Sequence, residues 1–281
     1  MNPEKTGQEH LTLGQRFLSW SNINPVRMVM WLVAITIVSF AIGFGILALS
    51  GGFPPAAGEN FSLFRNGAVS APGTTNISLD GAQQGELKVT LGAGKLLLQG
   101  GAPPGTFMET TVFSKSPVWQ PGFSRSMNAS KIQVAMIDKG HKAKEWFAVD
   151  SPNKWEIRMT EAVPLDLDVD VGAGDSRLEL GALNLSTLSM KNGAGDARID
   201  LAGYHGGRFD ADIENGVGDL TLRVPKDSNT KIEVQNGVGD IADSGLIREN
   251  GSFTTAGYSP SRPANTIRIK QGIGSISLEA V

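Results

Sequence analysis

Hydrophobic and polar residues alternate along several short stretches in the C-terminal two thirds of the chain. Residues 165–171 read Leu-Asp-Leu-Asp-Val-Asp-Val, and residues 209–214 read Phe-Asp-Ala-Asp-Ile-Glu. An alternation with a period of two places the apolar side chains on one face of a β-strand and the polar side chains on the other. These stretches therefore predict strands that are buried on one face.

A Gly-x-Gly corner follows the alternating stretches and leads into a second short apolar stretch. This pattern occurs in Val89–Leu98, Val169–Leu180, Met190–Leu201, Ile213–Leu222, Val234–Asp243 and Ile269–Leu278. From Gly174 to Gly239 the second glycines are spaced by 21, 23 and 21 residues. Asn-Gly pairs at several corners permit the positive φ of a tight turn. We expect structural roles for the corner glycines Gly172, Gly174, Gly193, Gly195, Gly216, Gly218, Gly237, Gly239, Gly272 and Gly274.

A unit of about 21 residues cannot bury an apolar face alone, but it can do so when it stacks on similar units. The repeats therefore predict an all-β, single-stranded β-solenoid-like domain over residues 86–281. An antiparallel sandwich built from the same hairpins remains the alternative.

Residues 28–49 form an uncharged, largely apolar segment of 22 residues. As a helix this segment would be about 33 Å long, enough to cross a bilayer, and it is longer than the apolar part of a cleaved signal peptide. Lys5, Arg16 and Arg27 precede it, and the first basic residue after it is Arg65. The positive-inside rule then predicts a cytoplasmic tail over 1–27. We expect a single-pass protein of the cell membrane, with a Gly/Pro-rich tether over 50–85 and an extracytoplasmic C-terminal domain.

The segment VPLDLDVDVGAGDSRLEL, followed by the corners NGAGD, NGVGD and NGVGD, resembles the extracytoplasmic β-solenoid ("toast-rack") domains. These occur in LiaF-like cell-wall-active antibiotic response proteins and in bacterial "putative adhesin" domains. The resemblance covers roughly residues 86–281 and implies a non-catalytic envelope protein that acts through protein contacts. It also implies a membrane sensor kinase or a cell-wall polymer as the partner. LiaF-like proteins usually have several membrane helices, whereas this chain is expected to have one. The alternative is a surface adhesin or wall-polymer-binding module.

Composition argues against several other classes of protein. The chain has no cysteine, and His10, His141 and His205 lie far apart, so we expect neither a metal site nor a cofactor. A formal net charge of -3 does not suit nucleic-acid binding. Signatures of hydrolases, metalloproteases and nucleotide-binding enzymes do not occur in the sequence. We therefore expect no catalytic residues, with a glycan-active enzyme on a β-helical scaffold as the less favoured alternative.

Asp175, Asp196, Asp219 and Asp240 occupy the same corner position in four repeats. Stacking would place them about 4.8 Å apart, which is close enough to raise the question of a bound Ca²⁺. We favour the simpler hypothesis that each carboxylate accepts a backbone N–H hydrogen bond in its own turn. Before the corners, the residues Asp170, Lys191, Glu214, Gln235 and Lys270 alternate in sign over the first three repeats. This alternation predicts charge pairing between neighbouring rungs.

The stretch Met108–Thr160 is less regular than the repeats. Its segments Thr110–Lys115, Lys131–Asp138 and Lys154–Thr160 have the pattern of strands. Its aromatic residues Trp119, Phe123 and Trp146 are candidates for partner binding. The competing hypothesis is that the aromatic residues of this stretch cap the exposed end of the solenoid core.

Overall fold

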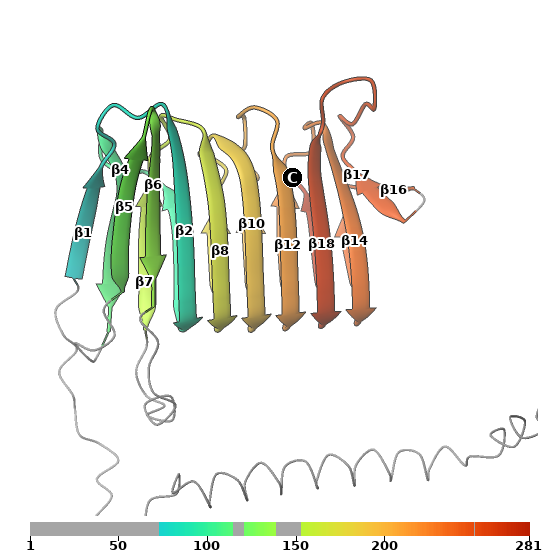
Figure 1. Ribbon diagram of the computed structural model, residues 1–281. Helices are drawn as coiled ribbons and strands as arrows, with labels where there is room; N and C mark the ends of the chain where they lie inside the picture. Colours follow the sequence, from blue (N-terminus) through green and yellow to red (C-terminus); the bar gives the residue numbers. More distant parts are fainter. Residues whose placement is uncertain (1–72, 115–120, 139–152, 250) are drawn as a thin grey trace, which may run out of the picture. The chain divides into compact units, whose positions relative to one another are not determined.

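The computed structural model describes residues 73–114, 121–138, 153–249 and 251–281 (Figure 1). These residues form nineteen β-strands in two sheets. Within these ranges there is no helix of the length and apolar character needed to span a bilayer. The predicted tail 1–27, the predicted span 28–49 and residues 50–72 of the predicted tether lie outside the described residues.

One sheet, which we call the long-strand sheet, contains the alternating stretches that precede the corners. Its spatial order is β16 (Ile247–Glu249), β17 (Ser252–Thr254), β14 (Thr230–Val238), β18 (Asn265–Ile273), β12 (Asp210–Val217), β10 (Leu185–Ala194), β8 (Leu165–Ala173), β2 (Gln84–Ala93), β6 (Lys131–Ile137) and β5 (Gly122–Asn128).

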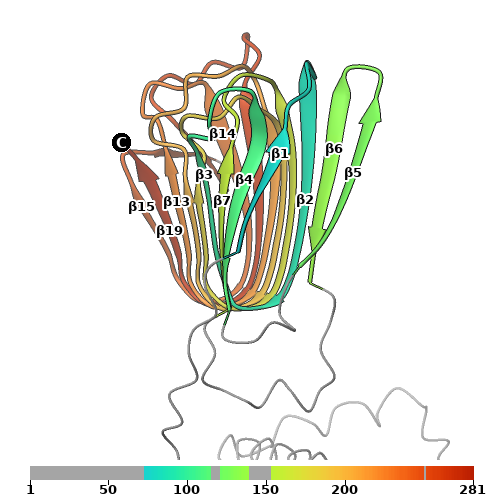
Figure 2. The same cartoon turned by 90° about the vertical axis from the view of Figure 1, so that its left-hand side faces the viewer.

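The short-strand sheet contains the stretches that follow the corners. Its spatial order is β1 (Gly73–Ser78), β4 (Thr106–Phe113), β7 (Lys154–Met159), β3 (Lys95–Gly100), β9 (Ser176–Glu179), β11 (Ala197–Asp200), β13 (Leu220–Val224), β19 (Ile276–Ala280) and β15 (Ile241–Ser244). The two sheets are joined along one edge, the corner edge, which is formed by the Gly-x-Gly corners (Figure 2).

Each rung is a long strand, a glycine corner and a short strand, and neighbouring rungs pair in parallel. Along β8, the apolar residues Leu167, Val169 and Val171 are at most 2% exposed, because they point into the space between the sheets. The alternating aspartates of the same strand lie on its outer face. Parallel pairing confirms the stacked-rung prediction, and the antiparallel sandwich is wrong.

The order of rungs in space differs from their order in the chain. Strand β18, from the last repeat, lies between β12 and β14: Asp210 pairs with Thr266, and Thr230 pairs with Asn265. The fourth and fifth corners of the sequence are therefore separated by the corner of Gly272 and Gly274. A prediction based on consecutive stacking places Asp240 beside Asp219, and that placement is wrong.

Antiparallel strands close the end of the stack that contains β1 and β5. Strand β4 pairs antiparallel with β1 and β7, and β5 pairs antiparallel with β6. The three strands predicted within Met108–Thr160 correspond to β4, β6 and β7. Strand β1 lies inside the predicted tether 50–85, so a domain boundary at residue 86 is too late. The pattern of β1 is weak because Ile77 is its one buried residue.

Candidate functional site: the glycine corners and the sheet faces beside them

The two glycines of each corner differ in backbone conformation. The second glycine has a positive φ, +133° at Gly174 and +123° at Gly195, which is a conformation that favours glycine. The first glycine does not have a positive φ. A Cβ atom at Gly216 would instead lie 2.3 Å from the carbonyl oxygen of Gly193 on the neighbouring rung. A Cβ atom at the second glycine would be just as close, 2.2 Å from the oxygen of Gly174 in the case of Gly195. Close approach of the rungs therefore requires glycine at both positions, and backbone conformation requires it at the second position as well.

A ladder of buried amides runs through the corners, and it was not predicted from the sequence. Asn192 Nδ2 donates to Asn215 Oδ1 at 2.8 Å, and Asn215 Nδ2 donates to Gln271 Oε1 at 3.0 Å. Asn215 Nδ2 also donates to the carbonyl oxygen of Gly218. Positive φ falls on the second glycine, so the Asn residues contribute hydrogen bonds and not the turn conformation. The recurrence of Asn directly before the first corner glycine was the sequence signal that could have predicted this ladder.

The corner aspartates connect neighbouring rungs. Asp196 Oδ1 accepts a hydrogen bond from the backbone N–H of Asp219 at 3.0 Å, and Asp219 Oδ1 accepts one from the N–H of Ser275 at 2.9 Å. The prediction of a bond within the same turn is therefore wrong for these aspartates, since their carboxylates bond to the next rung. A backbone hydrogen bond from Asp196 reaches Asp175 in the same way.

Lys95 forms an ion pair with Asp175, the first of the corner aspartates. Its Nζ lies 2.8 Å from Asp175 Oδ2, and this hydrogen bond, opposed by partial burial, holds the pKa of Asp175 below its ordinary value. Within the described ranges, no group of three or more His, Asp or Glu side chains is placed to hold a metal ion. The carboxylates of Asp175, Asp196 and Asp219 are committed to contacts between rungs.

Charged side chains on the outer face of the long-strand sheet alternate in sign from rung to rung. In spatial order these residues are Asp170, Lys191, Glu214 and Lys270, and the uncharged Gln235 follows them. The inserted β18 places Lys270 beside Glu214, with 3.2 Å between Nζ and Oε1. The predicted alternation is confirmed, and the spatial order extends it by one rung.

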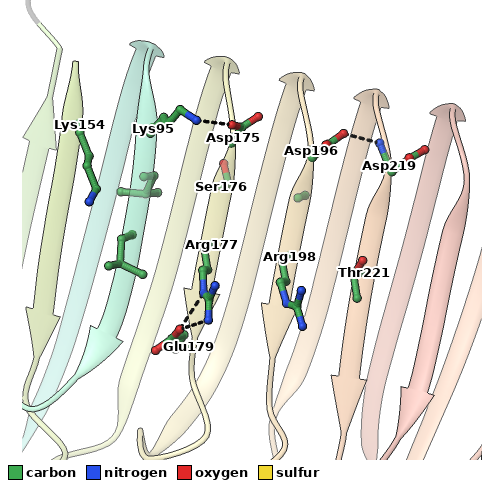
Figure 3. A pocket seen from close by; sticks show the side chains of 13 residues that line it. Lys95, Lys154, Asp175, Ser176, Arg177, Glu179, Asp196, Arg198, Asp219 and Thr221 are labelled. Carbon is green, nitrogen blue, oxygen red and sulfur yellow. Dashed lines mark hydrogen bonds and ion pairs between the residues drawn. The ribbon is translucent and has the colours of Figure 1, made fainter. Parts of the chain in front are cut away.

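A shallow hollow of about 640 Å³ lies on the outer face of the short-strand sheet (Figure 3). Charged side chains of both signs line it. Arg177 and Arg198 point outward from adjacent strands at the same level, with the corner aspartates above them and Glu179 below Arg177 in the view of Figure 3. This hollow was not predicted from the sequence, because its floor combines residues that only the stacking brings together.

Three aliphatic side chains form an exposed ridge along the corner edge. They are Val217, Ile273 and Val238, which are 51%, 55% and 66% exposed and lie on adjacent rungs. The equivalent position between the two corner glycines is alanine in three other rungs (Ala93, Ala173 and Ala194). Since alanine suffices for the corner, the larger exposed side chains have no evident role in folding. Comparison of this position among repeats could have revealed the ridge.

The predicted partner-binding aromatics are not brought together by the described structure. Trp119 and Trp146 lie outside the described residues. Phe123 lies on the edge strand β5, paired with Met136, and is 38% exposed. Trp155 of β7 is fully buried, and its Nε1 donates to Asn153 Oδ1 at 3.0 Å. At this end of the stack Trp155 fills the core, as expected of an aromatic cap, while Phe123 remains accessible.

These features define an all-β domain of stacked parallel rungs joined by glycine corners. The family model for the N-terminal domain of toast_rack (DUF2154) matches residues 65–223, and the chain belongs to this family. A structure of a "putative cell adhesion protein" from Clostridium sporogenes has the same fold. Its TM-score is 0.69 at 24% identity, and the match covers 75% of this chain and 99% of that chain.

A second structure, of a "putative adhesin" from Bacteroides fragilis, aligns with a TM-score of 0.28 at 11% identity. This alignment covers 74% of this chain and 97% of that chain. No curated protein matches the chain.

Proposed function

We propose that the chain is a non-catalytic, membrane-anchored cell-envelope protein whose toast-rack domain acts by contact with another membrane protein. The observation that carries this proposal is the aliphatic ridge of Val217, Ile273 and Val238 at the corner edge. Membership of the toast-rack family and the uncharged segment 28–49 support it. By resemblance to LiaF-like proteins, the expected partner is a stress-sensing kinase.

The path of the chain favours a partner in the membrane. Gly73, the first described residue, pairs with Val112, and Phe113 pairs with Lys154 beside Lys95, which directly follows a corner. The chain therefore enters the domain near the corner edge (Figure 1). If the predicted span ends at Leu49, 23 residues precede Gly73 and reach at most about 80 Å. Such a tether keeps the ridge within reach of a neighbouring membrane protein.

The charged groups of the domain support a non-catalytic role. An acid–base pair of carboxyl groups needs two different environments in a cleft. In this domain Glu86 and Asp166 share the ammonium group of Lys131, and Asp200 pairs with Arg223. These three acids thus serve rung-to-rung contacts on open sheet faces.

Co-purification of the full-length chain from detergent-solubilised membranes tests the proposal. We expect a sensor kinase to co-purify with the wild type and to be lost from an Ile273→Ser/Val238→Ser variant. Ile247→Ser is the matched control, because Ile247 is also exposed but lies on β16, away from the corner edge. Repeated failure to recover a kinase, or equal recovery with the ridge variant, would contradict the proposal.

A surface adhesin or wall-binding module is the second candidate function. The structure from Clostridium sporogenes is described as a "putative cell adhesion protein", and its likeness to this chain concerns the fold. This alternative predicts that the solubilised full-length protein sediments with purified cell wall. Sedimentation without kinase recovery would favour the adhesin.

Labelling of introduced cysteines tests the membrane topology, since the chain has none of its own. In intact cells, a membrane-impermeant maleimide should label Thr221→Cys on the domain surface. Thr6→Cys, in the predicted cytoplasmic tail, should be labelled after lysis only. Labelling of both in intact cells would exclude the proposed orientation.

A further inference from the structure

Two arginines lie side by side in the hollow of the short-strand sheet. Arg177 of β9 and Arg198 of β11 are direct neighbours in a parallel register. Like charges in this arrangement destabilise a sheet. The long-strand sheet shows the opposite arrangement at the same spacing, with Lys191 between Asp170 and Glu214. Other like-charge neighbours in the stack, such as Lys95 and Lys154 or Glu86 and Asp166, have an oppositely charged partner for both residues. The arginine pair differs because only one of its two members has such a partner.

The nearby acids relieve this cost only in part at Arg198. Arg177 is held by Glu179 at 2.7 Å. Among the described residues, Arg198 has no ion pair within 4 Å, and its attraction to Asp200 acts at longer range. Asp200 is bound to Arg223 at 2.6 Å, and Asp196 accepts the backbone N–H of Asp219. Both acids on the strand of Arg198 are thus engaged elsewhere.

We propose that Arg177 and Arg198 bind a singly charged oxyanion, either a phosphodiester or a carboxylate. Guanidinium groups donate parallel hydrogen bonds that match these oxygens, and two of them side by side can hold one anion. Leu97 and Thr221 are the next residues at this level on the neighbouring strands, so the level is free of acids on both sides. Acidic residues lie two positions away along both strands, roughly 7 Å, which disfavours a doubly charged ligand. This site is independent of the proposed kinase contact.

Thermal unfolding of the full-length protein in detergent tests the site. Dimethyl phosphate and acetate are the probes, with sodium chloride at equal ionic strength as the reference. A ligand that binds the folded state raises the melting temperature. With binding on the order of millimolar, we expect a rise with at least one probe over chloride in the wild type, and no rise in Arg198→Gln or Arg177→Gln.

The melting temperatures of the variants should also differ from that of the wild type when no anion is added. Arg198→Gln should melt about 1–3 °C above the wild type, because it removes the like-charge contact. Lys191→Gln is the matched control: it removes the same charge from a position flanked by acids. It should melt below the wild type and retain the response to the anion.

A response to dimethyl phosphate alone identifies a phosphodiester site, and a response to acetate alone identifies a carboxylate site. A response to both supports the pair as a general site for singly charged oxyanions. No response above chloride overturns the proposal, and so does a response that persists in both arginine variants.

Discussion

At the scale of single residues, the first glycine of each corner sets how closely two rungs approach. We predict that Gly216→Ala destabilises the domain by about 2–4 kcal/mol, because the new Cβ would lie 2.3 Å from a backbone oxygen that cannot move alone. Gly207→Ala is the control, since nothing lies within 4 Å of its Cβ position. That change should alter stability by less than about 1 kcal/mol. Urea unfolding measures both, and equal effects would contradict this role of the corner.

The amide ladder makes a second prediction, with a control built into the repeats. Asn215 and Asn236 occupy the same position in two NGVGD corners. Asn215 is buried, with bonds to Asn192, Gln271 and Gly218, whereas Asn236 is more exposed and donates to Gly239. Asn215→Ala should cost about 2–4 kcal/mol because it leaves buried amides without partners. Asn236→Ala should cost about 1 kcal/mol or less, and the reverse order would refute the ladder.

Some residue roles could be predicted from the sequence and others could not. Alternation correctly placed Leu167, Val169 and Val171 in the core, because burial on a strand follows its period of two. The bonds of Asp196 and the neighbours of Arg198 depend on which rung lies beside which. Local sequence does not contain that register between rungs.

At the scale of strands, the insertion of β18 was the feature least accessible to sequence reasoning. The corners of β12, β14 and β18 are nearly alike, so each could pair with either of the others. The observed order places Lys270 beside Glu214 and aligns Gln271 with Asn215. An ion pair and a hydrogen bond between side-chain amides thus favour the position of β18 between β12 and β14. Both interactions could be identified only from the structure.

Lys131 binds β6 to two other strands, and this contact predicts a pH dependence. Its Nζ lies 2.8 Å from both Glu86 and Asp166. The hydrogen bond from Lys131, followed by that from Gln133, holds the pKa of Glu86 below its ordinary 4.5. The resulting stability is present above pH 4.5 and is lost as the pH falls through the lowered pKa.

Lys131→Gln should therefore lower stability at pH 7 by up to about 1 kcal/mol, since these side chains are partly exposed and solvent screens them. The difference from the wild type should shrink below about pH 4.5 as the carboxylates become protonated. Melting curves from pH 3 to pH 7 measure it. A difference that grows toward low pH would show that the contact is not electrostatic.

At the scale of the whole molecule, the repeat period and the glycine corners were enough to predict a stack of rungs. They were not enough to predict the end of the stack that contains β1 and β5. The strand β1 and the edge strand β5 have few buried residues, so hydrophobic pattern identifies them poorly. The ridge and the arginine pair arise from the assembled stack and suit a protein that works through its surface.

A disulfide test on the corner edge addresses the central claim, that the corners form one stack with the last repeat inserted. Val217 and Ile273 are neighbours about 4.8 Å apart, whereas Val217 and Val238 are two strand spacings apart. In this cysteine-free chain, the pair Val217→Cys/Ile273→Cys should form a disulfide on mild oxidation. The pair Val217→Cys/Val238→Cys should stay reduced. The opposite result would show that the repeats stack in chain order and would contradict the account.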